Sequence, residues 1–378
     1  MVSTEAFSTA VGQARDLLRW RSPLRTELWA ARITAGLAPE RVRPFLAELA
    51  ADGGPEARLT LVALAAVNAG RPSPPTGAPD APDAASGPLA SDGEAVDDGQ
   101  AAGDGEAVSD GQAAGDGGSA ADGEAVVGAG VYADAARGLD ETLAGWVRRM
   151  GRVTCEGAWY GKADPYGEQV LAVLSFRYDN GKEPHILVVG IDQPHGGLAV
   201  DALVEEAKFL DDLELAAAEP GTVAGRILDA FELGDRIMGV EVADTLAGVR
   251  PLAITRAQGV PGLVHGASDD TLARFRDLPE MPGAREAFEK LAEFVGDRPL
   301  WWSPRRVSAF LTSWLPREAI LSEAAIAAMP EVVRAWSRFS GDHPAVLRQV
   351  DADAPRLPAL MADDSLAGLG KRIAQNRL

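Results

Sequence analysis

A low-complexity segment over residues 71–130 divides the chain into a short and a long folded part. Within it, Asp92–Gly103 (DGEAVDDGQAAG) is followed directly by a near copy at Asp104–Gly115, and a partial third copy lies at Asp122–Val126. The segment has almost no bulky apolar side chains, so burial cannot offset the conformational entropy that is lost when such a chain is ordered. We therefore predict a disordered linker over 71–130.

The linker also dominates the charge of the chain. Residues 72–130 carry nine Asp and three Glu with no Lys or Arg, and so account for −12 of the net charge of −20. Because no cationic face of the kind that binds phosphate is evident in the remaining sequence, we expect no nucleic-acid partner. We interpret the linker as a flexible acidic spacer, and the alternative is an acidic segment that recruits a basic partner.

Cysteine content and hydropathy are typical of an intracellular protein. The single cysteine, Cys155, excludes an intrachain disulfide and a multi-cysteine zinc site. The sequence does not begin with a charged segment followed by an apolar core, and no run reaches the ~18 apolar residues that a membrane span needs. We expect a cytoplasmic protein with no membrane partner.

Residues 1–70 have the pattern of a small helical bundle. Ser22-Pro23 is typical of a helix start, in which a hydroxyl caps the first turn and proline takes the first helical position. Apolar residues recur at helical spacing in four stripes: Phe7, Val11, Ala14 and Leu18; Leu24, Leu28 and Trp29; Val42, Phe45, Leu46 and Leu49; and Leu59, Val62 and Ala66. Four short helices can close one core.

A β-hairpin is predicted over residues 168–191. Glu168–Tyr178 and His185–Ile191 are rich in β-branched and aromatic residues, and the dipeptide Asn180-Gly181 between them is a strong hairpin signal. Since a two-stranded hairpin alone is marginally stable, we expect Val153–Tyr160 to add a third strand and helices to cover the sheet.

Helical patterns fill the rest of the long folded part. Amphipathic helices are expected at 139–150, 198–210, 223–233 and around 287–295. Ser303-Pro304 predicts a helix that ends at Pro316, and Pro330 predicts the start of the next. The predicted fold class is α+β and mostly helical, with a small antiparallel sheet. In chain order we expect a helical bundle (1–70), the acidic linker (71–130), an α+β domain (131–240), a helical region packed on it (241–350) and a Pro-rich, weakly helical tail (351–378).

The segment Asp192–Gly197 (DQPHGG) is the first candidate site. It follows an apolar strand and precedes the helix that we expect to begin near Leu198. Backbone amides at the start of a helix favour an anion, so Gly196 and Gly197 are candidate ligand-binding residues. The alternative is a plain turn, in which the carboxylate caps the loop and the glycines set its geometry.

Catalysis at this loop requires several side chains to converge. Asp192 is suited to orienting the imidazole of His195 as a general base or a metal ligand, and Asp201 supplies a further carboxylate. A pocket that works in this way brings these groups together with Trp159 and a third polar group such as Asp201 or Glu156.

The segment Trp301–Arg306 (WWSPRR) is a candidate partner-binding surface. Adjacent tryptophans at the start of a helix do not easily both point inward, so one of Trp301 and Trp302 is a candidate contact for a partner, with Arg305 and Arg306 nearby. The alternative is a hydrophobic staple that closes the start of the helix.

Other motifs of catalysis or cofactor binding are missing from the sequence. There is no phosphate-binding loop, dinucleotide fingerprint, G-x-S-x-G elbow or H-E-x-x-H pair. The four histidines are scattered along the chain. We therefore expect no metal site and no cofactor.

Three segments resemble proteins of high-GC Gram-positive (actinobacterial) bacteria: Ser22–Ile33, Asp192–Gly197 and Ser303–Ala319. The resemblance is to uncharacterised proteins and covers both folded parts but not the linker. It implies a bacterial, cytoplasmic origin and no particular activity.

Two functions of different classes are consistent with these patterns. The first is a non-enzymatic interaction or regulatory protein whose helical parts bind another protein, which fits the amphipathic helices, the eight tryptophans and the lack of a complete catalytic motif. The alternative is a hydrolase or small-ligand-binding domain that uses the loop of Asp192, His195, Gly196 and Gly197.

Overall fold

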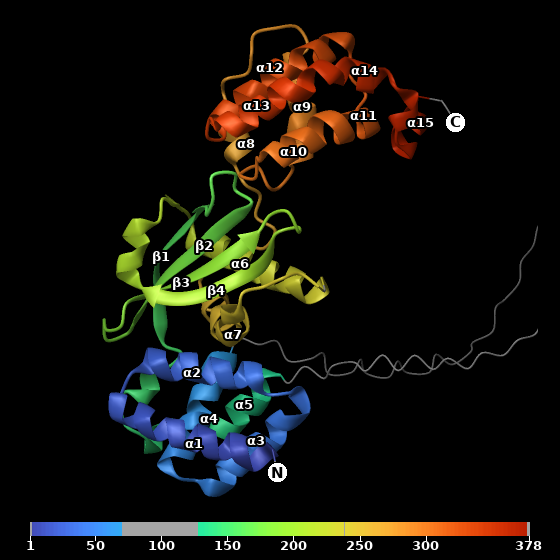
Figure 1. Cartoon of the computed structure of the whole chain (residues 1–378). Helices are drawn as coiled ribbons and strands as arrows, with labels where there is room; N and C mark the ends of the chain where they lie inside the picture. The colour runs from blue at the N-terminus through green and yellow to red at the C-terminus, as the bar shows by residue number, and fades with distance from the viewer. Residues whose placement is uncertain (1, 70–127, 238, 376–378) are drawn as a thin grey trace, which may run out of the picture.

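The computed structural model describes residues 2–69, 128–237 and 239–375, which form three units arranged along one axis (Figure 1). A helical bundle lies at one end, a β-sheet in the middle and a second group of helices at the other end. With 59% helix and 13% strand, the fold is α+β and mostly helical, as predicted. The predicted disordered linker lies outside the described residues up to residue 127.

Residues 2–69 form four helices that pack into one bundle, which confirms the prediction. These are α1 (Val2–Trp20), α2 (Pro23–Gly36), α3 (Pro39–Asp52) and α4 (Pro55–Asn68), and α5 (Ala129–Ala136) packs against α4 from beyond the linker. The hydroxyl of Ser22 accepts a hydrogen bond from the backbone N–H of Arg25, so the predicted cap starts α2. Ala14, Leu49 and Leu64 are fully buried in the core of this unit.

The helix predicted at 139–150 is wrong. The segment forms two short 3₁₀ turns, η1 (Asp140–Thr142) and η2 (Val147–Arg149), on either side of Gly145. Trp146, Val147 and Met150 still reach the bundle core from these turns, so their spacing reflects burial without a continuous helix. Glycine weakens a helix interior, which favours the break.

An antiparallel five-stranded sheet forms the middle of the described chain. Its strands are β1 (Val153–Lys162), β2 (Gln169–Tyr178), β3 (His185–Asp192), β4 (Leu198–Glu206) and β5 (Ala216–Ala217), in the spatial order β4-β3-β2-β1-β5. The β2–β3 hairpin and the third strand β1 confirm the predictions. Gly181 in the predicted turn has φ of +73°, a conformation that glycine adopts without strain.

The helix predicted at 198–210 is also wrong, because its first part is β4 and its second part is the 3₁₀ segment η3 (Ala207–Asp212). β4 pairs antiparallel with β3, from Leu198 opposite Asp192 to Glu206 opposite His185. Gly196 and Gly197, with φ of +100° and +94°, reverse the chain tightly between the two strands. Pairing with a central strand outweighs the local helical spacing of the apolar residues.

Two helices cover one face of the sheet. The predicted helix at 223–233 is confirmed as α6 (Pro220–Arg236), and Val223, Ile227 and Phe231 from it pack on the sheet. The second, α7 (Asp244–Gln258), was not predicted, because its apolar residues do not follow a single stripe and Pro251 interrupts the pattern. α7 contacts both α2 and β4, so it connects the bundle to the sheet.

A buried ion pair lies where α7 meets the bundle. The carboxylate of Glu27 on α2 accepts hydrogen bonds from the Arg256 guanidinium (2.5 Å), from the Tyr178 hydroxyl and from the backbone N–H of Gly151 (2.5 Å). Glu27 and Arg256 are 0% and 3% exposed. The group therefore links α2, β2 and α7 in the interior.

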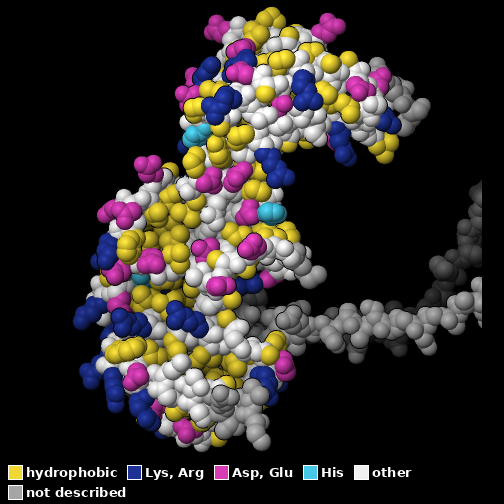
Figure 2. All heavy atoms as spheres, in the orientation of Figure 1, with side chains coloured by type: hydrophobic (Ala, Val, Ile, Leu, Met, Phe, Trp, Pro, Cys, Tyr) yellow, Lys and Arg dark blue, Asp and Glu magenta, His cyan; other side chains and the backbone are white. Residues whose placement is uncertain are grey.

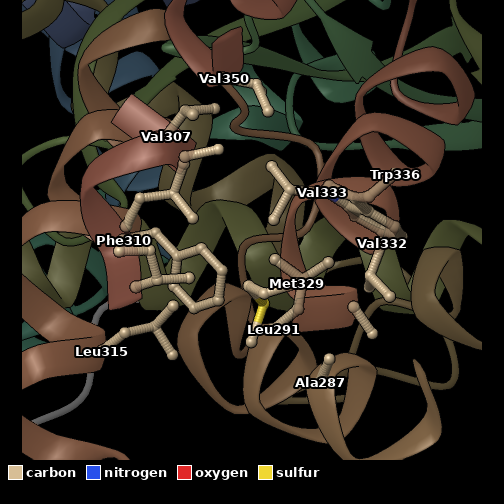
Figure 3. Packing of buried hydrophobic residues seen from close by; sticks show 14 of the residues in the cluster. Ala287, Leu291, Val307, Phe310, Leu315, Met329, Val332, Val333, Trp336 and Val350 are labelled. Atoms are coloured by element: carbon tan, nitrogen blue, oxygen red, sulfur yellow. The ribbon is translucent and has the colours of Figure 1, made fainter. Parts of the chain in front are cut away.

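The C-terminal unit is a compact set of helices. Its main elements are α8 (Thr271–Arg274), α9 (Ala284–Val295), α10 (Pro304–Ala309), the π-helical segment η4 (Phe310–Trp314), α11 (Leu315–Glu318), α12 (Glu323–Phe339) and α13 (Pro344–Asp353). The chain then continues through η5 (Ala354–Arg356), α14 (Leu357–Ala362), η6 (Asp364–Leu366) and α15 (Leu369–Ala374). In Figure 3, Val307, Phe310 and Leu315 lie on one side of the core, and Leu291, Met329 and Val333 lie on the other.

Neither predicted proline boundary in this unit is correct. The helix that begins at Pro304 continues past Pro316 to Glu318. Leu315 donates its N–H to the carbonyl of Phe310, five residues back, and this wider π turn relieves the clash that a proline ring makes with an α-helical turn. α12 begins at Glu323 after the Ser322 cap and contains Pro330, because its buried stripe continues across the proline.

Ser303 caps the start of α10, as the sequence predicts, and its contribution to stability can be measured. Ser303 is buried, and its hydroxyl accepts a hydrogen bond from the backbone N–H of Arg306 (3.3 Å). Ser303→Ala should lower the free energy of unfolding by about 1 kcal/mol in chemical denaturation. Ser308→Ala, within the same helix, is the control and should cause no loss, because alanine has the higher helix propensity.

Candidate functional site

The loop from Asp192 to Gly197 places two of the predicted site residues in contact. Nδ1 of His195 lies 2.7 Å from Oδ2 of Asp192, and the backbone N–H of His195 points at Oδ1 of the same carboxylate (3.4 Å). The imidazole side chain is 60% exposed. The carboxylate therefore orients the imidazole, as predicted, but on an open loop.

The predicted anion site at Gly196 and Gly197 is wrong, because Leu198 begins a strand and no helix starts there. The N–H of Gly197 donates to the carbonyl of Asp192 (2.8 Å), and that of Gly196 donates to the carbonyl of Gln193 (3.2 Å). Both amides are used within the hairpin turn. This geometry matches the alternative interpretation, in which the glycines shape a turn.

The other predicted groups do not converge on His195. Asp201 accepts a hydrogen bond from the Thr245 hydroxyl, Glu156 forms an ion pair with Arg177, and Trp159 packs with Val173 and Val188 on the other face of the sheet from α6. Asp192 lines a shallow groove of ≈ 550 Å³ with Asp164, Pro165, Tyr166, Glu168, Gln169, Pro194 and Val200. The groove lining contains no Ser, Thr or Cys nucleophile.

A second Asp–His pair with the same geometry lies elsewhere in the described chain, so an Asp–His contact alone does not indicate a catalytic site. Nδ1 of His265 lies 2.6 Å from Oδ1 of Asp229, and that imidazole is also more than half exposed. In the part of the chain that the structure describes, no group of three or more His, Cys, Asp or Glu side chains gathers in a way that holds a metal ion.

The segment Trp301–Arg306 is largely internal. Trp302 is 1% exposed and donates its indole N–H to the Ser337 hydroxyl (2.9 Å), and Arg306 is 5% exposed. Trp301 is half-buried, so Arg305 is the one exposed side chain of the four candidates. The predicted partner surface is therefore wrong for Trp302 and Arg306. Trp302 and Val307 share one core, as the staple interpretation expects.

A hollow of ≈ 580 Å³ lies where the bundle meets the sheet, and we call it the joint hollow. Three separate chain segments line it: the α1–α2 turn, the η1–η2 region and the β2–β3 turn. Its lining residues are Trp20, Arg21, Ser22, Pro23, Ala144, Gly145, Trp146, Arg149, Asn180, Lys182 and Glu183. Figure 2 shows Lys and Arg side chains gathered on this side of the molecule, around the junction of bundle and sheet.

The joint hollow is cationic. Its one acidic lining residue, Glu183, already accepts a hydrogen bond from the Ser22 hydroxyl. Among the described residues, no ion pair is formed by Arg21, Arg149 or Lys182 in the hollow or by Arg25 and Arg148, which lie beside Trp20 and Gly145. Within it Trp20 is 60% exposed, the largest exposed fraction of any aromatic side chain in the described residues.

Sequence reasoning missed this site because its cations are spread over three segments. Two short signals were nevertheless available: Arg19–Arg25 (RWRSPLR) holds three arginines, and Arg148–Arg152 (RRMGR) holds three more. Folding places Arg21 of the first cluster and Arg149 of the second in the lining of one hollow.

Comparison with protein-family models, curated proteins and solved structures gives no match for this chain. The resemblance to actinobacterial proteins stays a prediction. Within the described residues, no helix has the length and apolar character needed to cross a membrane.

Proposed function

We propose that the protein is a non-enzymatic interaction protein that binds an acidic segment of a partner protein in the joint hollow. One observation carries this proposal: three cations, Arg21, Arg149 and Lys182, line the same hollow as the exposed ring of Trp20. The single lining carboxylate, Glu183, balances only part of their charge, so the lining stays positive. Arginine beside an exposed tryptophan is the composition of a binding hot spot. Asp and Glu side chains of a partner supply the missing negative charge.

The charge of the whole chain favours an acidic peptide over nucleic acid. The net charge is −20, and −8 of it lies outside residues 72–130, so a long polyanion is repelled over most of the surface. A short acidic segment, in contrast, contacts only the Lys and Arg side chains of the joint hollow and avoids the negative surface elsewhere. The hollow also offers one exposed aromatic ring, Trp20, whereas single-stranded nucleic acid is held by several stacking rings.

Binding to a labelled oligo-glutamate peptide, followed by fluorescence anisotropy with the full chain, tests the proposal. Trp20→Ala and Arg149→Gln should each weaken binding about tenfold or more, because each removes one main contact of the occupant. Higher salt should weaken binding further, since the cations are near the surface.

The control for these variants is Arg285→Gln, which removes an exposed arginine of α9 that forms no ion pair among the described residues. It should bind the peptide as the wild type does. Equal affinity in the wild type and in Arg149→Gln contradicts the proposal. So does binding of single-stranded DNA that outcompetes the peptide.

A hydrolase or ligand-binding domain at the Asp192–His195 loop is the second candidate function. The 2.7 Å contact between Asp192 and His195 beside the groove supports it. A thermal-shift screen of small carboxylic and phosphoric esters then gives stabilisation that His195→Ala removes. Stabilisation that persists unchanged in this variant places the ligand elsewhere.

A further inference from the structure

Arg306 is a buried cation whose hydrogen-bonding capacity is only partly used. It is 5% exposed, and one of its terminal nitrogens donates to the carbonyls of Phe294 (3.3 Å) and Val295 (3.0 Å) at the end of α9. Its Nε and Nη1 are buried and have no acceptor within the described residues. The C-terminal carbonyls of α9 compensate part of the charge, but Nε and Nη1, which carry three N–H groups between them, have no acceptor.

Two further donors without acceptors lie beside it. The Arg306 guanidinium stacks 3.8 Å from the ring centroid of Trp301, and the Arg298 guanidinium lies 5.6 Å from the same centroid. Nε1 of Trp301 and Nε of Arg298 are both buried without a hydrogen bond in the described part of the chain. Three neighbouring side chains therefore each carry a buried N–H donor without an acceptor.

Negative charge is scarce around these two arginines. Asp297 lies 3.4 Å from Nε of Arg298 but is 81% exposed, and no carboxylate of the described residues forms an ion pair with Arg306. Burial together with the neighbouring Arg298 lowers the pKa of the Arg306 guanidinium to about 9, so it keeps its charge at neutral pH. A buried charge without a counter-ion is strongly unfavourable, and so is each unsatisfied donor.

We propose that Arg298, Trp301 and Arg306 bind a phosphate group, either as inorganic phosphate or as the phosphoryl group of a small metabolite. Its oxygens accept the N–H groups that lack acceptors, and its two negative charges match the two guanidinium groups. Arg298 has 31% of its side chain exposed, so the phosphate enters from its side of the cluster.

The location gives the site a role in joining two units. Another nitrogen of Arg298 donates to the carbonyl of Gln193 in the β3–β4 turn (2.7 Å), and the backbone N–H of Trp302 donates to the carbonyl of Tyr166 (2.8 Å). A phosphate held by Arg298 and Arg306 therefore contacts the segment that ties the C-terminal helices to the sheet. Its binding stabilises this joint.

Thermal unfolding of the full chain in inorganic phosphate, against chloride at matched ionic strength, tests the proposal. Saturating phosphate should raise the Tm of the wild type by about 5 °C. Arg306→Met should abolish the rise, whereas Arg305→Met, the exposed neighbour, should keep it. A phosphorylated sugar that raises the Tm at lower concentration than phosphate identifies a metabolite as the source.

A second variant keeps the test decisive where Arg306→Met does not fold. Trp301→Phe keeps a ring under the guanidinium and removes the indole N–H donor, so at least a tenfold higher phosphate concentration should be needed for the same rise in Tm. No phosphate-specific rise in the wild type overturns the proposal. An equal dependence on phosphate concentration in the wild type and in Trp301→Phe also overturns it.

Discussion

Glu27→Gln should lower the free energy of unfolding by about 3–5 kcal/mol, because it leaves the buried Arg256 guanidinium without its counter-ion. The amide keeps the shape of the carboxylate but faces three donors, from Arg256, Tyr178 and Gly151, that all require acceptors. The Glu27 carboxylate also raises the pKa of the buried Tyr178 hydroxyl, after the larger effect of burial, so this hydroxyl stays a proton donor.

Chemical denaturation of the full chain, followed by circular dichroism, measures this loss. Glu289→Gln, an exposed carboxylate of α9, is the matched control and should change stability by less than about 0.5 kcal/mol. A loss of less than about 1 kcal/mol in Glu27→Gln, the range of surface ion pairs, would show that the pair is not buried in solution.

Stability should fall by about 3 kcal/mol as the pH is lowered from 6.5 to 4, through His185 alone. His185 is 1% exposed, and burial lowers its pKa from 6.5 to about 4, although its Nδ1 donates to the carbonyl of Glu183. Below pH 6.5 the unfolded chain binds a proton that the folded chain does not. The contribution of His185 to the free energy of unfolding is therefore complete above pH 6.5, and it is lost progressively as the pH falls towards 4.

The charged and titratable groups that face this imidazole are Arg256 from α7 and Tyr178 from β2, and the positive charge of Arg256 adds to the lowering of its pKa. His185→Phe keeps an aromatic ring beside Phe176 and removes the titration. Urea denaturation across this pH range should therefore give a shallower pH dependence in the variant, by about 3 kcal/mol. Parallel curves for the two proteins would contradict the assignment.

Short sequence signals predict the fold well where a few adjacent residues determine the local structure. Asn180-Gly181 between two β-rich runs specifies a hairpin, and Ser22-Pro23 and Ser303-Pro304 specify helix starts. Such signals fail where pairing with another strand determines whether a segment becomes a helix or a strand. Leu198–Glu206 has apolar residues at both helical and alternating spacing, and only the neighbouring strand β3 makes it a strand.

The difference between local and long-range contacts also explains which features of the candidate sites could be predicted from the sequence. The contact between Asp192 and His195 is local and could be predicted, because the two residues lie three positions apart in one turn. Burial of Trp302 and Arg306 depends on α9 and α12, which are distant in the sequence. The joint hollow depends on three segments that only tertiary packing brings together, so no single stretch of sequence predicts it.

Cross-linking from position 20 tests the central claim most directly. A photoreactive aromatic residue that replaces Trp20 in the full chain keeps the ring at the joint hollow, and illumination in an extract of the native host links it to the occupant. Mass spectrometry should identify a partner segment rich in Asp and Glu, and oligo-glutamate or Arg149→Gln should suppress the cross-link. The same probe at Leu369, 68% exposed in the C-terminal unit, should not capture this segment. Cross-links to nucleic acid alone, or the same products from both positions, would contradict the account.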